Sequence, residues 1–271
     1  MKPRVIAIIQ GRMGSSRLPG KILLDLAGKP MLARVFDRTS RSRSVDEVIF
    51  ATTEDHSDDP VAAYCTENNI PFSRGSQYDV LDRFHQILRI HTADVIVRIT
   101  ADCPLIDPDV IDTAVMTLIR EGYDFVCNRL PPPYHRTYPI GLDVEVCSLS
   151  VLEKAWNESD EAQHREHVMP YLYEGVKFSQ VSPVLEEGLS KRGFKIAMIH
   201  HPVDYGSYRW TVDTAEDLEF ARQIFGRFNE RDDFSWIEVL ELVQAEPKLM
   251  EINAGIQHKT LKDIDSRAQG G

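Results

Sequence analysis

The alternation of short β-branched apolar runs with amphipathic stretches constrains the fold of this chain most. Apolar runs of about five residues are typical of strands buried on both faces, and strands that alternate with helices predict a mostly parallel sheet between helical layers. We expect strands at 5–9, 48–51, 95–99, 124–127, 140–146, 194–199 and 208–212. We expect helices at 31–41, 60–68, 80–91, 108–121, 215–228 and 235–244, with others between the fifth strand and about residue 173. The sequence therefore predicts an α/β fold with ligands at the carboxyl ends of its strands.

The strand–helix rhythm breaks at about residue 129, where three consecutive prolines (131–133) exclude regular structure. We interpret residues 1–250 as one domain, with an insertion at about 129–205 that forms the acceptor side of the ligand site. Residues 251–271 are predicted to be a polar C-terminal tail.

A loop rich in glycine and in cations follows the first expected strand. Residues 11–21 read GRMGSSRLPGK and contain Arg12, Arg17 and Lys21. Glycines after a buried strand let backbone N–H groups converge on a phosphate chain, and arginine and lysine side chains add charge. A basic surface turn is the alternative, but phosphate binding is the better interpretation of these residue types.

The overall charge limits the choice of partner. The chain of 271 residues has a formal net charge of −11, which disfavours nucleic acid and favours a small anionic ligand at the basic loop. No apolar run approaches the roughly 20 residues that span a bilayer, so we expect no membrane association. The four cysteines form no Cys-x-x-Cys pair, and no signal-peptide pattern begins the chain, so we expect a cytoplasmic protein with reduced thiols.

The basic loop does not fit the common nucleotide-binding motifs. A Walker A loop needs four residues between its first glycine and Gly-Lys, followed by Ser or Thr. Here five residues separate Gly14 from Gly20, and Ile22 takes the place of the hydroxyl residue. The Gly-x-Gly-x-x-Gly spacing of dinucleotide-binding folds is also absent. The sequence thus predicts a different type of phosphate loop.

Two aspartates are expected at strand ends without a structural role. Asp107 precedes Pro108 and is predicted to cap a helix, which leaves Asp102 unassigned. Thr214 and Asp217 have capping-box spacing, which leaves Asp213 unassigned. Two such carboxylates could hold Mg²⁺ across a cleft. Each alone is more often a cap or turn residue, but beside a phosphate loop the metal site is the better hypothesis.

The basic loop also carries a family resemblance. QGRMGSSRLPGK at 10–21 resembles the first motif of the cytidylyltransferase superfamily, which includes CMP-KDO and CMP-acylneuraminate synthetases. The likeness is greatest to the SpsF-type branch of spore-coat polysaccharide biosynthesis. Further similar blocks are RGS at 74–76, DVLDRF at 79–84, TADCPLI at 100–106, GLDVE at 141–145, REHV at 165–168 and VDTAEDL at 212–218. Gly11 stands where Ala is more usual in the family.

The resemblance implies a Rossmann-like nucleotidyltransferase fold (GT-A-like), a three-layer sandwich around a mostly parallel mixed sheet, and a homodimer. It also implies transfer of CMP from CTP to a small acidic acceptor, with Mg²⁺ as cofactor, in polysaccharide precursor synthesis. By position, the implied catalytic residues are Arg12, Arg17, Lys21 and Asp102, and the implied Mg²⁺ ligands are Asp102 and Asp213. Nucleotide-binding residues would be Gly11, Gly14, Ser15, Ser16, Arg74, Gly75, Ser76 and Arg83. We also expect acceptor-side residues at Tyr138, Asp143, Glu145, Arg165 and His167. The sequence shows no obvious general base; Asp143, Glu145 and His167 are candidates, each more often an acceptor contact or a structural polar group.

Alternatives remain open at this stage. A GT-A glycosyltransferase uses an Asp-x-Asp after a strand, and Asp107-Pro108-Asp109 fits those letters but is expected to open a helix. A non-catalytic nucleotide-binding protein is the other alternative. His164 and His167 have a spacing that can bind zinc on a helix, although a pair without a third ligand is more often structural.

Overall fold

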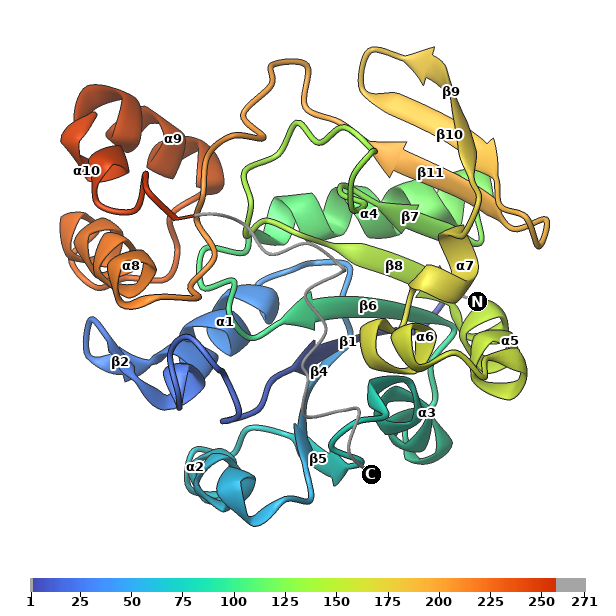
Figure 1. The fold of residues 1–271 in the computed structure, drawn as a ribbon, viewed down its shortest axis with the longest axis horizontal. Helices are drawn as coiled ribbons and strands as arrows, with labels where there is room; N and C mark the ends of the chain where they lie inside the picture. Colours follow the sequence, from blue (N-terminus) through green and yellow to red (C-terminus); the bar gives the residue numbers. More distant parts are fainter. Residues whose placement is uncertain (1, 257–271) are drawn as a thin grey trace.

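The computed structural model describes residues 2–256, which form a nine-stranded sheet flanked by helices (Figure 1). The strand order is β5-β4-β1-β6-β8-β7-β11-β10-β9. These strands are β1 (Val5–Gln10), β4 (Glu47–Thr53), β5 (Phe72–Gly75), β6 (Val95–Thr100), β7 (Phe125–Cys127), β8 (Glu145–Ser148), β9 (Lys177–Ser182), β10 (Leu185–Leu189) and β11 (Lys195–Ile199). A separate two-stranded sheet pairs β2 (Asp25–Leu26) with β3 (Lys29–Pro30).

The sheet is mixed but mostly parallel. β5, β4, β1 and β6 pair in parallel, and β8 runs antiparallel between β6 and β7. β11 continues in parallel from β7, and β10 and β9 extend the sheet as an antiparallel hairpin. Strands of the stretch 129–205 therefore lie in the same sheet as the N-terminal strands. The proposed division into one domain and a tail stays a prediction, and most of that tail, residues 257–271, lies outside the described residues.

Alternating strand residues face two hydrophobic cores. In β1, Val5, Ala7 and Ile9 join one core, while Ile6 and Ile8 join the other. This alternation follows from the two-residue period of a strand. The helices are α1 (Met31–Thr39), α2 (Asp59–Glu67), α3 (Val80–Ile90), α4 (Pro108–Glu121), α5 (Leu149–Glu158), α6 (Ala162–His167), α7 (Pro170–Tyr173), α8 (Ala215–Arg227), α9 (Trp236–Ala245) and α10 (Lys248–Glu251).

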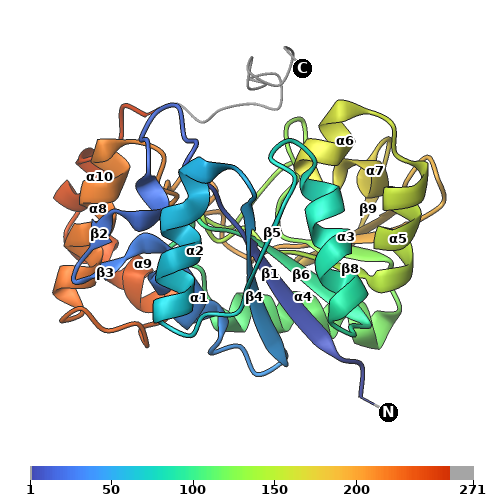
Figure 2. The same cartoon turned by 90° about the horizontal axis from the view of Figure 1, so that it is seen from below.

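Helices cover both faces of the sheet. α1, α2, α4, α8 and α9 contribute to the first core, and α3, α5 and α7 to the second. Figure 2 shows α1 and α8 on one side of the central strands and α3 and α5 on the other. The predicted α/β class, with a mostly parallel mixed sheet between two helical layers, is confirmed. No helix within residues 2–256 is long and apolar enough to cross a membrane.

Two local predictions about helix starts are confirmed. The side chain of Asp107 caps α4 by accepting hydrogen bonds from the N–H groups of Asp109 and Val110. Thr214 caps α8, and both hydrogen bonds of its capping box with Asp217 are present. Asp102 and Asp213 are not helix caps, as the capping pattern predicted.

Two predicted strands are wrong in extent or in kind. The predicted strand 140–146 begins only at Glu145, and the predicted strand 208–212 does not form; a single bridge joins Ile140 to Arg209. Gly141 explains the break because its φ of +107° is unfavourable for other residues, and a Cβ there would lie 2.5 Å from the nitrogen of Thr211. The segments at Gly141 and Thr211 therefore pass very close to each other, which explains why the hydrogen-bonded ladder between them is limited to a single bridge.

Candidate active site

The basic loop leaves the carboxyl end of β1 and is held in place by its own backbone and by Asp58. Gly20, at φ +71°, makes the turn that begins a short 3₁₀ helix at Lys21–Leu23, and its N–H donates to the carbonyl of Met13 (3.0 Å). The N–H of Met13 donates to Asp58 Oδ1 (2.7 Å). Asp58 is buried and also accepts hydrogen bonds from Thr52 and Thr53 of β4. The loop is thus tied to the neighbouring strand.

Gly11 begins the loop at a close approach between three strands. A Cβ there would lie 2.6 Å from the Cβ of Ala101 and 2.8 Å from Cζ of Phe50. An alanine at this position would therefore force Ala101 or Phe50 to shift. Gly14 differs, because its nearest atoms would be those of Arg12 at 3.8 Å.

Lys21 joins the two aspartates for which the sequence gave no structural role. Its Nζ donates to Asp102 Oδ2 (2.8 Å), to Asp213 Oδ1 (2.9 Å) and to the carbonyl of Val212 (2.8 Å). The prediction that Asp213 ends a strand is wrong, because no strand forms at 208–212. Asp213 lies close to Asp102 because the N–H of Val212 donates to the carbonyl of Asp102 (2.8 Å). The predicted convergence of the two carboxylates is therefore present, although by a different backbone arrangement.

Asp213 is the more heavily compensated of the two carboxylates. Its Oδ2 lies 2.8 Å from Arg17 Nη2 and 2.9 Å from Arg209 Nη2. Burial opposes its ionisation, but Lys21, Arg17 and Arg209 outweigh burial and lower the pKa of Asp213 to about 2. Burial likewise opposes the charge of Lys21, but Asp102 and Asp213 outweigh it and raise the pKa of Lys21. Asp213 and Lys21 are therefore both charged at neutral pH.

The donor set fits a hard divalent cation. Asp102 and Asp213 direct oxygens at one point, which the ammonium of Lys21 holds in this structure. Mg²⁺ is commonly bound by one or two carboxylates together with water and substrate phosphates. Asp102 also retains an exposed side (27% of its side chain), from which a cation could enter.

A cavity of about 230 Å³ lies beside the loop. It is lined by Gln10, Gly11, Arg12, Gln77, Tyr78, Val80, Arg83, Glu166 and His167. Burial lowers the pKa of Arg83 to about 10, and the charge of Arg12 adds to this, so Arg83 stays protonated at neutral pH. Burial lowers the pKa of His167 to about 4, and the charges of Arg98 and Arg129 act in the same direction. At neutral pH the cavity therefore contains two arginine cations and an uncharged imidazole.

Asp143 and Glu145 are held in ion pairs and do not line this cavity. Arg98 Nε donates to the side chain of Gln10 (2.8 Å), and Arg98 also pairs with Glu145. Asp143 pairs with Arg136 and lies 3.6 Å from Arg129 Nε. Gln10 connects the Arg98–Glu145 pair to the cavity wall, whereas Glu145 does not line the cavity itself.

Three predicted site residues are engaged away from the cavity. Arg74 donates to the carbonyls of Thr53 (2.7 Å) and Asp55 (2.9 Å) and lies 2.7 Å from Asp59, where it supports the start of α2. The guanidinium of Arg74 thus joins β4, β5 and α2. The assignment of Arg74 to nucleotide binding stays a prediction.

Arg165 and Tyr138 also lie outside the cavity lining. Arg165 Nε donates to Asp79 (2.8 Å), and its Nη1 donates to the carbonyl of Trp156 (2.9 Å), so that it links α6 to the start of α3. Tyr138 is buried against the ring of Trp236 and lines a different cavity of about 650 Å³, between α4 and the β9–β10 hairpin. The structure does not bring either residue to the basic loop.

The remaining predicted residues support the loop or the cavity. Ser15 Oγ accepts a hydrogen bond from the N–H of Leu18 (3.3 Å), and Ser76 Oγ accepts one from the N–H of Asp79 (3.1 Å). A Cβ on Gly75 would lie 2.8 Å from Cγ of Arg83, so this glycine lets Arg83 pack closely. Ser16 and Gly14 belong to the loop between Met13 and Gly20.

Sequence reasoning missed several residues that shape the site. The missed cavity residues are Gln10, Gln77, Tyr78, Val80 and Glu166, and the missed supports are Asp58 and Arg209. Gln10 and Glu166 lie within motifs already noted, next to residues that were selected. Tyr78 is an exposed aromatic (52%), a feature visible only once the fold is known. The pairing of Arg209 with Asp213 and Asp217 has no sequence pattern that would single it out.

Comparison with known proteins identifies the family of the chain. A family model described as cytidylyltransferase matches residues 6–232. The chain belongs to the cytidylyltransferase family. It is 31% identical over 264 residues to an uncharacterized protein of Methanocaldococcus jannaschii, a match that covers 97% of this chain and 99% of that protein. It is 29% identical over 250 residues to the spore coat polysaccharide biosynthesis protein SpsF of Bacillus subtilis, with 90% of this chain and 95% of SpsF covered.

Further relatives agree with this assignment. The 3-deoxy-manno-octulosonate cytidylyltransferase of Geobacter sulfurreducens is 37% identical over 114 residues, which covers 42% of this chain and 45% of that enzyme. A solved cytidylyltransferase from Leptospira borgpetersenii superimposes with a TM-score of 0.78 at 29% identity and covers 95% of this chain and 100% of its own. The predicted resemblance and the nucleotidyltransferase fold are confirmed. The chain is a CTP-using nucleotidyltransferase, and Asp107-Pro108-Asp109 opens α4 as a helix start.

Proposed function

We propose that this cytidylyltransferase transfers CMP from CTP to a small acidic sugar or a phosphorylated acceptor, with Mg²⁺ as cofactor and pyrophosphate as the second product. The observation that carries the proposal is that Lys21 contacts Asp102 and Asp213, and Arg17 contacts Asp213, on the same loop that lines the cavity with Gly11 and Arg12. The names of SpsF and of the 3-deoxy-manno-octulosonate enzyme support a role in the synthesis of surface polysaccharide precursors.

The loop cations would bind the triphosphate. Arg17 and Lys21 are held by carboxylates in this structure, so they would exchange carboxylate oxygens for phosphate oxygens when CTP binds. Arg12, in the cavity wall, would contact the same phosphates, and Arg83 would lie nearer the nucleoside. Fixed cations of this kind stabilise the charge that develops on departing pyrophosphate.

Asp102 and Asp213 would hold Mg²⁺. When bound, the ion would neutralise charge on the α-phosphate and on the leaving group. The two side chains come from segments that the Val212–Asp102 hydrogen bond keeps together, so the chain fixes both ligands without the ion. Arg209 and Asp217, which pair with each other, orient Asp213 from the opposite side.

The acceptor would enter on the side of Glu166 and His167. With a pKa of about 4, His167 is uncharged at neutral pH and is a weak base, because an efficient general base has a pKa near the working pH. His167 would therefore orient the attacking oxygen by a hydrogen bond. Asp143 and Glu145, both in ion pairs, would act through Arg129 and Arg98 rather than by taking a proton. The expected homodimer and cytoplasmic location stay predictions.

The test is release of pyrophosphate from each of the four NTPs, with Mg²⁺ and a panel of sugar acids and phosphorylated polyols. We expect turnover with CTP, loss of turnover in EDTA, and recovery when Mg²⁺ is added. Turnover with another NTP and none with CTP would contradict the cytidylyl assignment. Binding of CTP without turnover across the panel would favour the non-catalytic alternative.

Matched aspartate variants separate the metal ligands from other acidic residues. Asp213→Asn and Asp102→Asn should each reduce kcat by roughly 10²–10³ because they act on developing charge. Asp109→Asn is the control, since this aspartate is exposed (69% of its side chain) at the start of α4. A large loss of activity in Asp109→Asn, with little loss in Asp213→Asn, would instead support the glycosyltransferase motif.

A further inference from the structure

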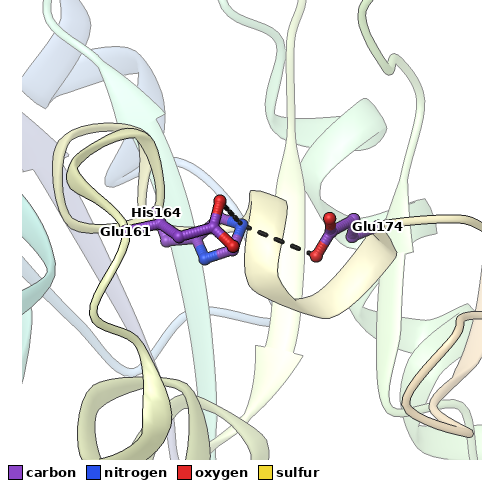
Figure 3. Close-up of side chains that lie close together, drawn as sticks. All are labelled: Glu161, His164 and Glu174. Atoms are coloured by element: carbon purple, nitrogen blue, oxygen red, sulfur yellow. Dashed lines mark ion pairs between the residues drawn. The ribbon is translucent and has the colours of Figure 1, made fainter.

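A second cluster of potential metal ligands lies around α6, apart from the aspartates of the active site. Glu161 precedes α6, His164 lies within it, and Glu174 follows α7 (Figure 3). One ligand atom from each of the three side chains lies within 4.8 Å of the other two. His167, which the sequence pattern paired with His164, lines the active-site cavity and does not join this cluster.

His164 is the unusual member of the cluster. Its side chain is 1% exposed, and its Nε2 has no hydrogen-bond partner in the described part of the chain. Buried polar atoms are almost always hydrogen-bonded, so an unpartnered imidazole nitrogen calls for an explanation. Nε2 points between the two carboxylates, 3.7 Å from Glu161 Oε2 and 3.8 Å from Glu174 Oε2.

These separations are too long for hydrogen bonds but suit ligands of a common ion. Metal–ligand distances of about 2.0–2.2 Å place the donor atoms of a tetrahedral site roughly 3.5 Å apart. One imidazole with two carboxylates is a donor set that Zn²⁺ accepts, whereas Mg²⁺ prefers oxygen donors alone. Burial lowers the pKa of His164, although Glu161 and Glu174 oppose this, and a lowered pKa favours the neutral imidazole that binds a metal ion.

We propose that Glu161, His164 and Glu174 form a binding site for a divalent transition-metal ion such as Zn²⁺, separate from the site of nucleotidyl transfer. Three protein ligands leave a fourth position for water. The ion would link α6 to the residue that follows α7. Because α6 also carries Glu166 and His167, the ion would stabilise one wall of the active-site cavity.

Two neighbouring cations compete for the same carboxylate. Lys191 Nζ lies 2.5 Å and Arg192 Nη1 lies 2.8 Å from Glu174 Oε2. The guanidinium of Arg192 is also stacked on Tyr171, whereas Lys191 is about half exposed and held by Glu174. An ion bound at Glu174 must share it with Lys191, so removal of the Lys191 charge should tighten metal binding. A cluster that serves only as an ion-pair network predicts no such gain.

The experiment is a calorimetric titration of EDTA-treated protein with Zn²⁺, combined with ¹⁵N spectra of the histidine side chains. It is carried out in an Asp213→Asn background, so that the carboxylate pair of the active site contributes little binding. We expect one Zn²⁺ per chain and a large shift of the His164 Nε2 resonance. Glu161→Gln should weaken binding at least about tenfold, and Lys191→Ala should strengthen it.

Glu161 is the preferred variant because its side chain is about half exposed and its change should not disturb folding. His164→Asn serves as a second variant, checked for a native circular dichroism spectrum and thermal transition. The proposal is overturned if the His164 resonance does not respond to Zn²⁺, or if Glu161→Gln binds Zn²⁺ as tightly as the parent. Unchanged or weaker binding in Lys191→Ala would also overturn it.

Discussion

Replacement of Lys21 by methionine tests the charge arrangement of the active site. Methionine keeps a similar apolar stem but removes the ammonium that contacts Asp102 and Asp213 at 2.8 and 2.9 Å. The two carboxylates would then face each other across the space that the ammonium occupied. We expect a folded but less stable protein that has lost turnover.

The size of the destabilisation follows from burial and from the remaining partners. Loss of one partner of a fully buried ion pair costs about 3–5 kcal/mol. The side chains of Asp102 and Asp213 are 27% and 16% exposed, and Asp213 keeps Arg17 and Arg209. We therefore expect a loss of about 2 kcal/mol in the free energy of unfolding, which lowers Tm by roughly 4–8 °C in a domain of this size.

Mg²⁺ should restore the lost free energy of unfolding in Lys21→Met. Without the ammonium, a divalent cation meets two uncompensated carboxylates, and a concentration 100 times Kd adds about 2.7 kcal/mol of stability. In the parent the cation competes with Lys21, so its effect on Tm should be smaller. The assay is thermal unfolding during a MgCl₂ titration at constant ionic strength.

Lys29→Met is the matched control. Lys29 also bridges two aspartates, Asp37 at 2.6 Å and Asp232 at 2.9 Å, but its side chain is 44% exposed. Asp37 is 39% exposed and keeps its hydration, and Asp232 keeps its ion pair with Arg34 at 2.9 Å, so this variant should show no enhanced response to Mg²⁺. An equal Mg²⁺-dependent rise of Tm in the parent and in Lys21→Met would refute the idea that Lys21 occupies the cation position.

Two further predictions concern the cavity and the loop. In the unfolded chain the imidazole of His167 takes a proton below about pH 6.5, but in the folded protein only below about pH 4, so acidification through this window favours unfolding. His167→Gln should flatten the dependence of unfolding free energy on pH between 6.5 and 4, measured by urea denaturation; equal slopes would contradict the assignment. Gly11→Ala should destabilise by about 1–3 kcal/mol because its Cβ meets Ala101 and Phe50, whereas Gly14→Ala should change stability by less than about 0.5 kcal/mol. Comparable Tm values for these two variants would contradict this prediction, because they would show that the neighbouring residues shift at little energetic cost.

Local signals in the sequence predicted much of the fold. The apolar runs of β1, β4 and β6 and the capped starts of α4 and α8 depend on residues close together in the chain. The remaining strands depend on tertiary contacts. β9 and β10 have side chains that are largely exposed or half-buried, so they lack the apolar alternation that marks a strand. β5 is a four-residue strand with a glycine, held by pairing with β4.

The candidate site was predictable to a similar degree. Capping patterns correctly separated Asp102 and Asp213 from the structural Asp107 and Asp217. They could not show that the carboxylates meet on Lys21, because that contact depends on the crossing of two distant segments. Arg74, by contrast, carries the same charge as Arg17 but is held by two carbonyls and Asp59. Residue type alone cannot distinguish a cation that faces a ligand from one that supports the backbone.

The pairing of Arg17 and Lys21 with Asp102 and Asp213 also changes how the basic loop is understood. Two cations and two carboxylates make this part of the site neutral before any ligand binds, and Arg209 is likewise balanced by Asp217. A triphosphate alone would have to displace carboxylates from Arg17 and Lys21. This would leave Asp102 without a cation and Asp213 with Arg209 alone, which is unfavourable at a largely buried position. A divalent cation that binds together with the triphosphate removes this penalty. The carboxylates then bind the cation, while the phosphates bind the arginine and the lysine. The ion pairs therefore predict that Mg²⁺ and CTP bind to this chain with positive coupling, and that Lys21→Met reduces the coupling.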